Sequence, residues 1–433
     1  MTLQRGLWVF ILRVYSFQLV TELKMVWILT FVFSLGTANA TTNDFSDEYA
    51  LSRFVISATD GSTFALKGQS RFSFRDIEGR GGPDYDSITD TRTIGTRSPS
   101  VGLEDSMLAA ELTLQGGWAW HLQLGFSPTV AWADAAWVEW SGDAGIFNVL
   151  LEAGHHHSVV ARHEWGARRS LGSRVYWGSP EEHLVGELST KLGMVSIRSV
   201  GSLAMMRPLG ADTINDGGDQ AGTLSVLSYD SSRTFSGNMP VAGGLLAVGL
   251  GPVELSVFGF GGSLAEQGGI NELFNRMGNY SSLSGDTGST EFYWWGGRWD
   301  VDSEIGQVVA ETVMSKEGLL DRRLLQVEAR GRIQNIKMFD SIEPWSRFEY
   351  MAILNGGDEV EGGLPFRSAA TSQAITWDWN VYTFGLSIWW QNRWVALHLE
   401  HAMIFEQNGS DSLSIENEPI ANNETTLQLE LRF

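Results

Sequence analysis

The last residues of the chain alternate strictly between apolar and polar side chains. Apolar residues hold one parity, namely Leu427, Leu429, Leu431 and Phe433. Polar residues hold the other, namely Gln428, Glu430 and Arg432. A β-strand has a side-chain period of two, so this segment predicts a strand with one apolar and one polar face, as expected between lipid and water. A half-buried strand of a soluble sheet could show the same pattern.

The same alternation recurs along the chain and predicts many further strands. We expect strands at 63–77, 109–118, 120–127, 134–140, 146–153, 184–191, 194–204, 223–229, 244–250, 253–260, 291–300, 306–315, 322–336, 345–354, 379–390 and 393–405, with the weakest alternation between 184 and 260. Short turns are expected at Gly116-Gly117, Ser141–Gly145 and Gln391-Asn392. The long polar segment 262–288 is expected to be an extracellular loop or a plug segment, and the acidic, glycine-rich segment 356–376 is expected to be a second long loop.

Short turns that alternate with long polar loops are typical of the periplasmic and extracellular ends of an outer-membrane barrel. Beyond Ala40 no apolar run approaches the length of a membrane helix, and a barrel is the only other way to satisfy every backbone group in lipid. The sequence therefore predicts an all-β fold, a transmembrane antiparallel β-barrel of 16 to 18 strands. We take 16 as the expectation because such barrels prefer even numbers.

The N-terminal segment has the features of a secretory signal. The apolar run from Val26 to Leu35 is too short to span a bilayer and is followed by small residues that end at Ala40. We expect cleavage after Ala40, which leaves residues 41–433 as the barrel. Either Met1 or Met25 could be the true start, because an ordinary signal peptide would begin at Met25.

Composition and charge narrow the class further. Residues 1–40 carry a net charge of +2, so their removal takes the charge from −21 to −23, which argues against nucleic acid as a partner. The chain has no cysteine, which excludes a small scaffold held by disulfides. Its 18 tryptophans and 22 phenylalanines suit the aromatic girdles of a membrane barrel; Trp140 and Trp390 are candidates.

Several short segments, in this order, resemble porins related to the phosphate-selective porin O and P family. They are Phe64–Phe74, Trp118-Ala-Trp120, Asp134–Trp140, Trp345–Tyr350 and Leu431-Arg-Phe433. The resemblance covers most of the mature length and is vague between Tyr176 and Tyr293. It implies a 16-stranded, usually trimeric channel for small anions, with basic residues at its constriction. It also implies insertion through the barrel-assembly machinery, which would read the C-terminal Phe433.

The polar parities give the residues expected to line a pore. Basic candidates are Lys67, Arg71, Arg75, Arg330, Arg332, Arg347 and Arg432. Acidic candidates are Glu111, Glu139, Glu328, Glu349, Glu400 and Glu430. A pore selective for oxyanions should carry rings of one sign, whereas this set is nearly balanced. The mixture fits a general diffusion pore, and it fits equally a set of ion pairs that only hold the wall.

One basic segment follows the strand that ends near Ala153. It contains His155-His-His157, Arg162, His163, Arg168, Arg169 and Arg174. We expect a constriction loop whose arginines meet anionic solutes; a solvated loop is the alternative. The histidines could bind zinc or nickel, but adjacent residues do not easily converge on one ion, so we expect no metal or other cofactor. Asp212 to Asp219 lacks the spacing of an EF-hand and reads as a solvated turn.

Together these features predict a Gram-negative outer-membrane porin through which small hydrophilic solutes or ions, phosphate among them, diffuse passively. A receptor or adhesin barrel that acts through its long loops is the first alternative. A barrel enzyme is the second, and we do not expect it: His157 and Ser158 are the only close pair, and neighbours in a strand point to opposite faces.

Overall fold

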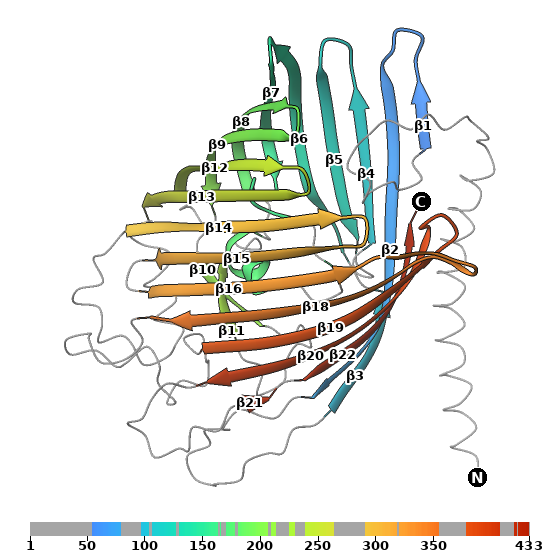
Figure 1. The fold of residues 1–433 in the computed structure, drawn as a ribbon, viewed down its shortest axis with the longest axis vertical. Helices are drawn as coiled ribbons and strands as arrows, with labels where there is room; N and C mark the ends of the chain where they lie inside the picture. The colour runs from blue at the N-terminus through green and yellow to red at the C-terminus, as the bar shows by residue number, and fades with distance from the viewer. Residues whose placement is uncertain are drawn as a thin grey trace.

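The computed structural model describes residues 54–78, 97–103, 106–126, 130–162, 165, 170–177, 181–206, 209–213, 225–229, 239–263, 291–317, 320–354, 378–407, 420–421 and 423–432. Most of these residues belong to one antiparallel sheet (Figure 1). The expected signal peptide, Phe433 and nearly all of the two long predicted loops lie outside these ranges. Within them, no helix has the length and hydrophobicity needed to cross a bilayer.

The fold is a closed barrel of 16 antiparallel strands, as the alternation predicted. Its strands are β2 (Thr63–Glu78), β4 (Ser106–Thr113), β5 (Trp118–Phe126), β6 (Ala131–Ala144), β7 (Phe147–His156), β8 (Glu181–Leu192), β9 (Val195–Met206), β12 (Met239–Leu250), β13 (Val253–Ser263), β14 (Glu291–Ser303), β15 (Gly306–Glu317), β16 (Leu320–Gly331), β18 (Phe339–Ile353), β19 (Asp378–Trp390), β20 (Val395–Gln407) and β22 (Glu424–Arg432). Consecutive strands of this series pair with each other.

The barrel closes where its first strand meets its last. β2 and β22 pair antiparallel, with Gln69 opposite Arg432 and Ile77 opposite Glu424. Closure gives each of the 16 strands a neighbour on both sides, so their backbone groups are satisfied within the wall, as a lipid environment requires.

Six short strands complete the described part. β3 (Arg97–Leu103) runs along β2 beyond β4, β17 (Ile333–Ile336) continues the edge of β16 on β18, and β21 (Ile420–Ala421) pairs with β20. β1 (Phe54–Ser57) pairs with the start of β2. β10 (Leu209–Thr213) and β11 (Ser225–Tyr229) form a separate two-stranded sheet.

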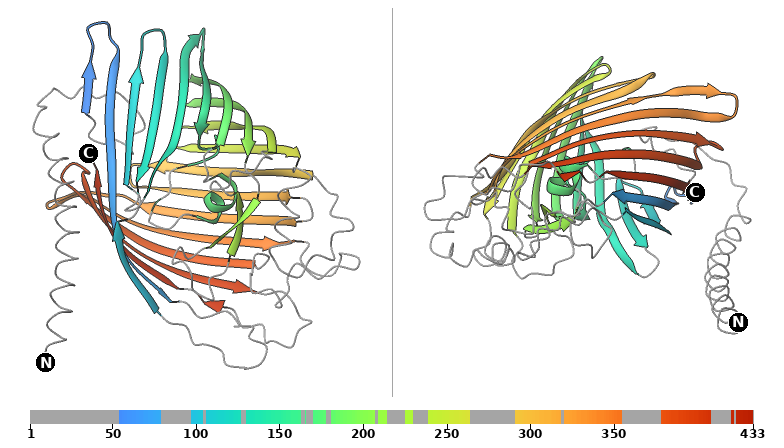
Figure 2. Two further views of the ribbon diagram at one scale, coloured as in Figure 1. Left: turned by 180° about the vertical axis from the view of Figure 1, so that it is seen from behind. Right: turned by 90° about the horizontal axis from the view of Figure 1, so that it is seen from below.

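The wall is strongly twisted. In Figure 1, β2 and β4–β7 run upright, whereas β14–β20 cross the view, as strand tilt in a barrel produces. A single π-helical turn, η2 (Ser173–Trp177), lies on the concave side of the wall in both views of Figure 2. The segment between β7 and β8 therefore folds into the barrel and does not extend away from its rim.

Three local expectations were wrong. Of the segment 223–229, Ser225–Tyr229 forms β11 beside β10 and is not a strand of the barrel wall. The segment 322–336 is interrupted after Gly331, so it divides into β16 and β17. Gly142–Ala144 continue β6, which leaves Gly145, with φ of 70°, at the turn. In each case the pairing with a neighbouring strand, and not the alternation within the segment, decides where the strand begins and ends.

The turn between β19 and β20 also differs from the expected two-residue turn. Four residues separate Trp390 from Val395, and three of them, Gln391, Asn392 and Arg393, have φ of 56°, 59° and 64°. Such left-handed backbone costs energy in residues other than glycine. Hydrogen bonds offset part of this cost: Arg393 N donates to Asp340 Oδ2 at 2.9 Å, and Trp394 N donates to Gln391 O at 3.2 Å.

Candidate functional site

The barrel strands have one exposed apolar face and one buried polar face. On β16, Val327 is 37% exposed, whereas Gln326 and Glu328 on either side of it are 1% and 0% exposed. β22 repeats the pattern, with Leu427 and Leu429 exposed and Glu430 buried. In a closed membrane barrel the apolar parity points outward and the polar parity inward. The inner face is therefore the polar one.

We call residues 158–177 the inner loop; its described residues are 158–162, 165 and 170–177. Polar contacts fasten it to the wall formed by β14–β18. Arg162 Nη2 lies 2.5 Å from Glu328 Oε2 on β16, and Arg298 Nη2 on β14 donates to Val160 O at 2.6 Å. Leu171 N donates to a carboxylate oxygen of Glu349 on β18. The loop thus uses buried charges on three strands as anchors.

Aromatic packing holds the middle of the inner loop at Trp165. Trp165 is 5% exposed and forms a buried cluster with Val309 and Trp345. The Arg330 guanidinium carbon lies 5.1 Å from the centre of the Trp165 ring. Large buried rings contribute strongly to stability, so this cluster fixes the middle of the loop against the wall.

The end of the inner loop packs through η2. Tyr176 Oη lies 2.9 Å from Ser315 Oγ on β15, and the centre of the Trp177 ring is 6.2 Å from that of Trp294 on β14. Gly172 faces the Trp177 ring so closely that an added Cβ would come within 2.6 Å of it. The inner loop therefore narrows the barrel interior from the side of β13–β18.

Wall arginines on β14–β22 and on β2 lie beside glutamates. We call this group the ion-paired wall; its pairs are Arg298 with Glu311, Arg330 with Glu343, Arg347 with Glu349, Arg71 with Glu430, Arg432 with Glu430 and Arg75 with Glu424. Buried charges of opposite sign compensate each other's loss of hydration. This wall is consequently close to neutral in charge.

The inner face of β4–β8 is different, because imidazole and indole rings form a continuous row there. The rings of His121 and Trp137 stack with centres 4.3 Å apart, His156 meets Trp137 edge-on at 4.4 Å, and His183 lies 5.3 Å from His156. We call these four residues the histidine ladder. Gly154, with φ of 146°, lies beside Trp137, where a Cβ would come 2.4 Å from Ala136 O.

Carboxylates flank the histidine ladder. Glu139 Oε2 lies 3.4 Å from His121 Nε2, and Asp134 Oδ2 lies 3.7 Å from His157 Nε2. Glu152 on β7 is directly opposite Glu139 in the strand register. Glu187 on β8 is partnered by Arg198 at 3.8 Å. Acidic groups and imidazoles therefore dominate this side of the interior.

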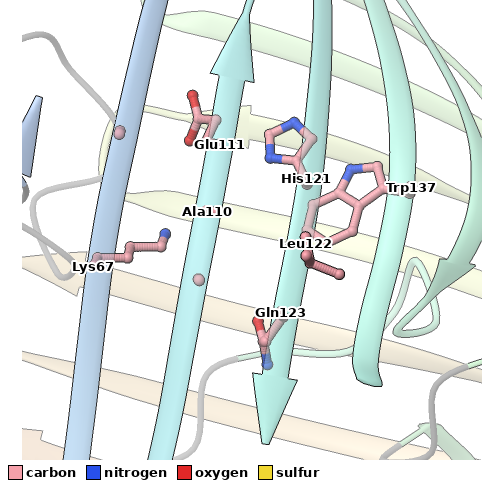
Figure 3. Close-up of a pocket in the computed structure, with 9 residues that line it drawn as sticks. Lys67, Ala110, Glu111, His121, Leu122, Gln123 and Trp137 are labelled. Atoms are coloured by element: carbon pink, nitrogen blue, oxygen red, sulfur yellow. The ribbon is translucent and has the colours of Figure 1, made fainter. Parts of the chain in front are cut away.

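A hollow opens on the same side of the barrel, beside β2. Its charged and aromatic lining comes from Lys67 on β2, Glu111 on β4, His121 on β5 and Trp137 on β6. Figure 3 shows these side chains projecting to the same side of the sheet, with the His121 ring against the Trp137 ring. The hollow can hold water or the polar groups of a small solute.

The residues predicted to line a pore occupy both sides of the interior. Lys67 and Glu111 line the hollow, and Glu139 contacts the histidine ladder. Arg71, Arg75, Arg330, Arg347 and Glu349 belong to the ion-paired wall, Glu328 holds the inner loop, and Glu400 is 2% exposed. Arg332 lies between β16 and β17, where Nη1 is 2.6 Å from Asp302 Oδ1.

The structure describes only some of the arginines that were expected in a constriction loop. Arg162 is described and pairs with Glu328. Arg168 and Arg169 lie outside the described residues, and of Arg174 only its place in η2 is described. Whether these three cations meet solutes therefore stays a prediction.

Several charged residues of the inner face are not among the residues that the sequence predicts to line a pore. Arg298 and Glu311 face each other across β14 and β15, and Glu343 binds Arg330. The alternation along each strand could have placed them on the inner face: Arg298 has the same parity as Trp294, and Glu343 has the same parity as Arg347. The histidine ladder could not be found in this way, because it joins residues from four strands.

Among the described residues, no group of three or more histidine, cysteine, aspartate or glutamate side chains is arranged to hold a metal ion. Of the histidines proposed as metal ligands, His156 belongs to the ladder and His157 pairs with Asp134. Asp212 lies in β10, and most of the acidic segment that follows it is outside the described residues.

No family model and no curated protein sequence matches the chain. Solved structures do resemble it. The outer membrane channel DcaP of Acinetobacter baumannii shares 12% identity with a TM-score of 0.52, over 87% of this chain and 99% of that chain. An anion-selective porin from Comamonas acidovorans shares 11% identity with a TM-score of 0.50, over 86% of this chain and 99% of that chain.

Salmonella typhi OmpF, in a complex with daunomycin, gives 9% identity and a TM-score of 0.50, over 88% of this chain and 100% of that chain. At such identities a likeness shows the fold and does not transfer a solute or a site. These structures, together with the 16-strand closure, show that the chain has the fold of outer-membrane porins.

Proposed function

We propose that this protein is a porin, a water-filled channel in the outer membrane of a Gram-negative bacterium through which small hydrophilic solutes or ions diffuse passively. The observation that carries the proposal is the closed barrel with apolar residues outside, charged residues inside, and a loop fastened to one side of the interior. A barrel of this strand number is wide enough for an aqueous channel. Because the inner loop occupies the side of β13–β18, the side that carries the histidine ladder is the candidate path for solutes through the barrel.

The proposal includes export through a signal peptide cleaved after Ala40, recognition of Phe433 by the barrel-assembly machinery, and assembly as a homotrimer. The exposed apolar outer face supports contact with outer-membrane lipid. Cross-linking of the protein in membranes tests the trimer, and deletion of Phe433 tests assembly.

An anion preference, for phosphate or a similar ion, is a narrower form of the same proposal. The cations of the ion-paired wall are matched by glutamates, so the preference would have to come from the inner loop, through Arg168, Arg169 and Arg174. Replacement of Arg168 and Arg169 by glutamate tests this. A change in the ratio of anion to cation permeability in planar bilayers supports an anion path at the loop, and an unchanged ratio excludes it.

Conductance of the purified protein separates the classes of function. Steady open pores support the porin. A folded but silent barrel supports a receptor or adhesin, and hydrolysis of lipid by the purified barrel supports an enzyme.

A further inference from the structure

We propose that the hollow beside β2 is a binding site for zwitterionic solutes, such as α-amino acids, which carry both a carboxylate and an ammonium group. Lys67 binds the carboxylate, and Glu111 binds the ammonium group. The inference rests on the proposed channel function and adds a class of solute to it. The hollow lies on the side of the histidine ladder, whereas the inner loop is fastened to β14–β18.

The first observation is that two opposite charges of the hollow lack ion-pair partners. Lys67 and Glu111 are both partly exposed. Among the residues that the structure describes, neither forms an ion pair, whereas the arginines of the ion-paired wall lie beside glutamates. The Thr113 hydroxyl donates to Glu111 Oε1 at 3.3 Å and leaves the charge of that carboxylate uncompensated. The hollow therefore offers a cation and an anion that a solute can compensate.

The strand register explains why these two charges do not neutralise each other. Lys67 on β2 is directly opposite Ala109 on β4, and Glu111 is directly opposite Ala65. The charged residues thus hold diagonal positions, whose Cα atoms are about 7–8 Å apart in an antiparallel pair. Both alanines are small and buried, so the space between the charges stays open. Figure 3 shows the two charged side chains on the same side of neighbouring strands, at different levels along them.

The size and the remaining lining of the hollow suit a small molecule. Its empty space is about 370 Å³, including the part that opens to the interior. Small-molecule sites hold about 300–1,000 Å³, so the hollow is at the lower end of that range. The stacked rings of His121 and Trp137 form one side of it and offer apolar contact to a solute side chain. A single amino acid with an apolar side chain matches these features.

The pairing of charges favours a zwitterion over a solute of one sign. An α-amino acid carries its carboxylate and its ammonium group on one carbon, so it can bridge two opposite charges that stand a few atoms apart. Each end then makes a charge-assisted hydrogen bond. A simple anion at Lys67 also faces Glu111, and a simple cation at Glu111 also faces Lys67. Repulsion by the second wall charge therefore selects against both single-charge solutes.

The test compares three solutes of similar shape at neutral pH. L-phenylalanine carries both charges, phenylpropionate carries the carboxylate alone, and phenethylamine carries the ammonium group alone. Titration calorimetry of the purified barrel in detergent measures the three dissociation constants. The decrease in single-channel current on addition of each solute measures binding in the open pore. We expect L-phenylalanine to bind at least about tenfold more tightly than either analogue.

Variants of the two charged residues assign the binding to the hollow. Lys67→Met and Glu111→Gln should each weaken the binding of L-phenylalanine about tenfold, because each removes one charge-assisted contact. Lys67→Met should not weaken the binding of phenethylamine. The double variant Lys67→Glu, Glu111→Lys exchanges the charges and should recover most of the affinity, since a zwitterion can bind in the reverse orientation. Lys191→Met is the matched control, because Lys191 is an exposed lysine of β8 outside the hollow.

Equal affinity for the three solutes overturns the inference, as does full binding of L-phenylalanine by both single variants. A charge-exchanged variant that binds as weakly as the single variants overturns it too, because the two charges would then not act together on the solute. Pores that conduct without any preference for L-phenylalanine overturn the binding site and leave the channel function intact. A folded barrel that binds L-phenylalanine in the expected pattern and conducts no ions supports the site but overturns its role in a channel.

Discussion

Arg162 of the inner loop and Glu328 of β16 form an ion pair, with Nη2 2.5 Å from Oε2 and the glutamate side chain 0% exposed. The two residues are 166 positions apart in the sequence, so this contact links the interior segment to the opposite wall of the barrel. Removal of one partner leaves a buried charge without its counter-ion. The pair therefore fastens the described start of the inner loop to the wall at β16.

The replacement Arg162→Gln should destabilise the barrel by about 3–5 kcal/mol, because Glu328 stays buried without its cation. Denaturant unfolding in detergent micelles measures the free energy. The double variant Arg162→Gln, Glu328→Gln should lose less than the sum of the two single variants, since the remaining groups are then neutral. Additive losses would show that the pair does not couple the loop to the wall.

Trp165→Ala should release the middle of the inner loop. The ring is buried against Val309 and Trp345, and truncation of a buried aromatic ring costs about 3–5 kcal/mol. We expect a larger or noisier single-channel conductance in addition to lower stability. Trp120→Ala is the control, because Trp120 is 59% exposed on the outside of β5. An equal effect of both variants on conductance would mean that Trp165 does not position the loop.

Val327→Arg tests the assignment of the outer face. Val327 is exposed between two buried polar residues of β16, so an arginine there would face lipid. Near the middle of the bilayer this costs about 2–4 kcal/mol, whereas Val327→Leu should cost little. Unfolding from lipid vesicles measures the difference. Equal stability of the arginine and leucine variants would place this face away from the hydrocarbon.

Gly116 and Gly117, in the turn between β4 and β5, form a matched pair. Both have positive φ, 80° and 84°, but a Cβ on Gly117 would lie 1.9 Å from Ser141 O, whereas one on Gly116 meets nothing within 4 Å. Gly116→Ala should cost about 1–2 kcal/mol for the backbone conformation alone. Gly117→Ala should cost about 1–3 kcal/mol more, because the backbone of β6 at Ser141 must move. Equal costs in unfolding experiments would argue against the close approach of Ser141.

Much of the barrel follows from the alternation of side chains. In β16, β18, β20 and β22 the predicted parities match the exposed and buried residues, because a period of two is a local property of a strand. Segmentation of the chain gives 16 to 18 strands, the preference of such barrels for even numbers favours 16, and the closed barrel confirms that number. The end of β16 at Gly331 and the separate pairing of β11 with β10 depend on which strands pair, which the alternation within one segment does not encode.

The candidate site was less predictable for the same reason. Parity places Arg330 and Glu343 on the inner face, but it does not reveal that they pair with each other. The stacking of His121 on Trp137 depends on the register between β5 and β6. That register shifts at a bulge between Gln123 and Leu124, which the alternation alone does not reveal. Charges can thus be assigned to a face from sequence, whereas their partners require the closed fold.

The central claim is that the closed barrel is an open channel, and single-channel recording of the purified protein in a planar bilayer tests it most directly. We expect discrete, long-lived steps of current that scale with salt concentration, as a water-filled lumen requires. A protein that is folded and inserted, and yet gives no current steps at any salt concentration, would contradict the account.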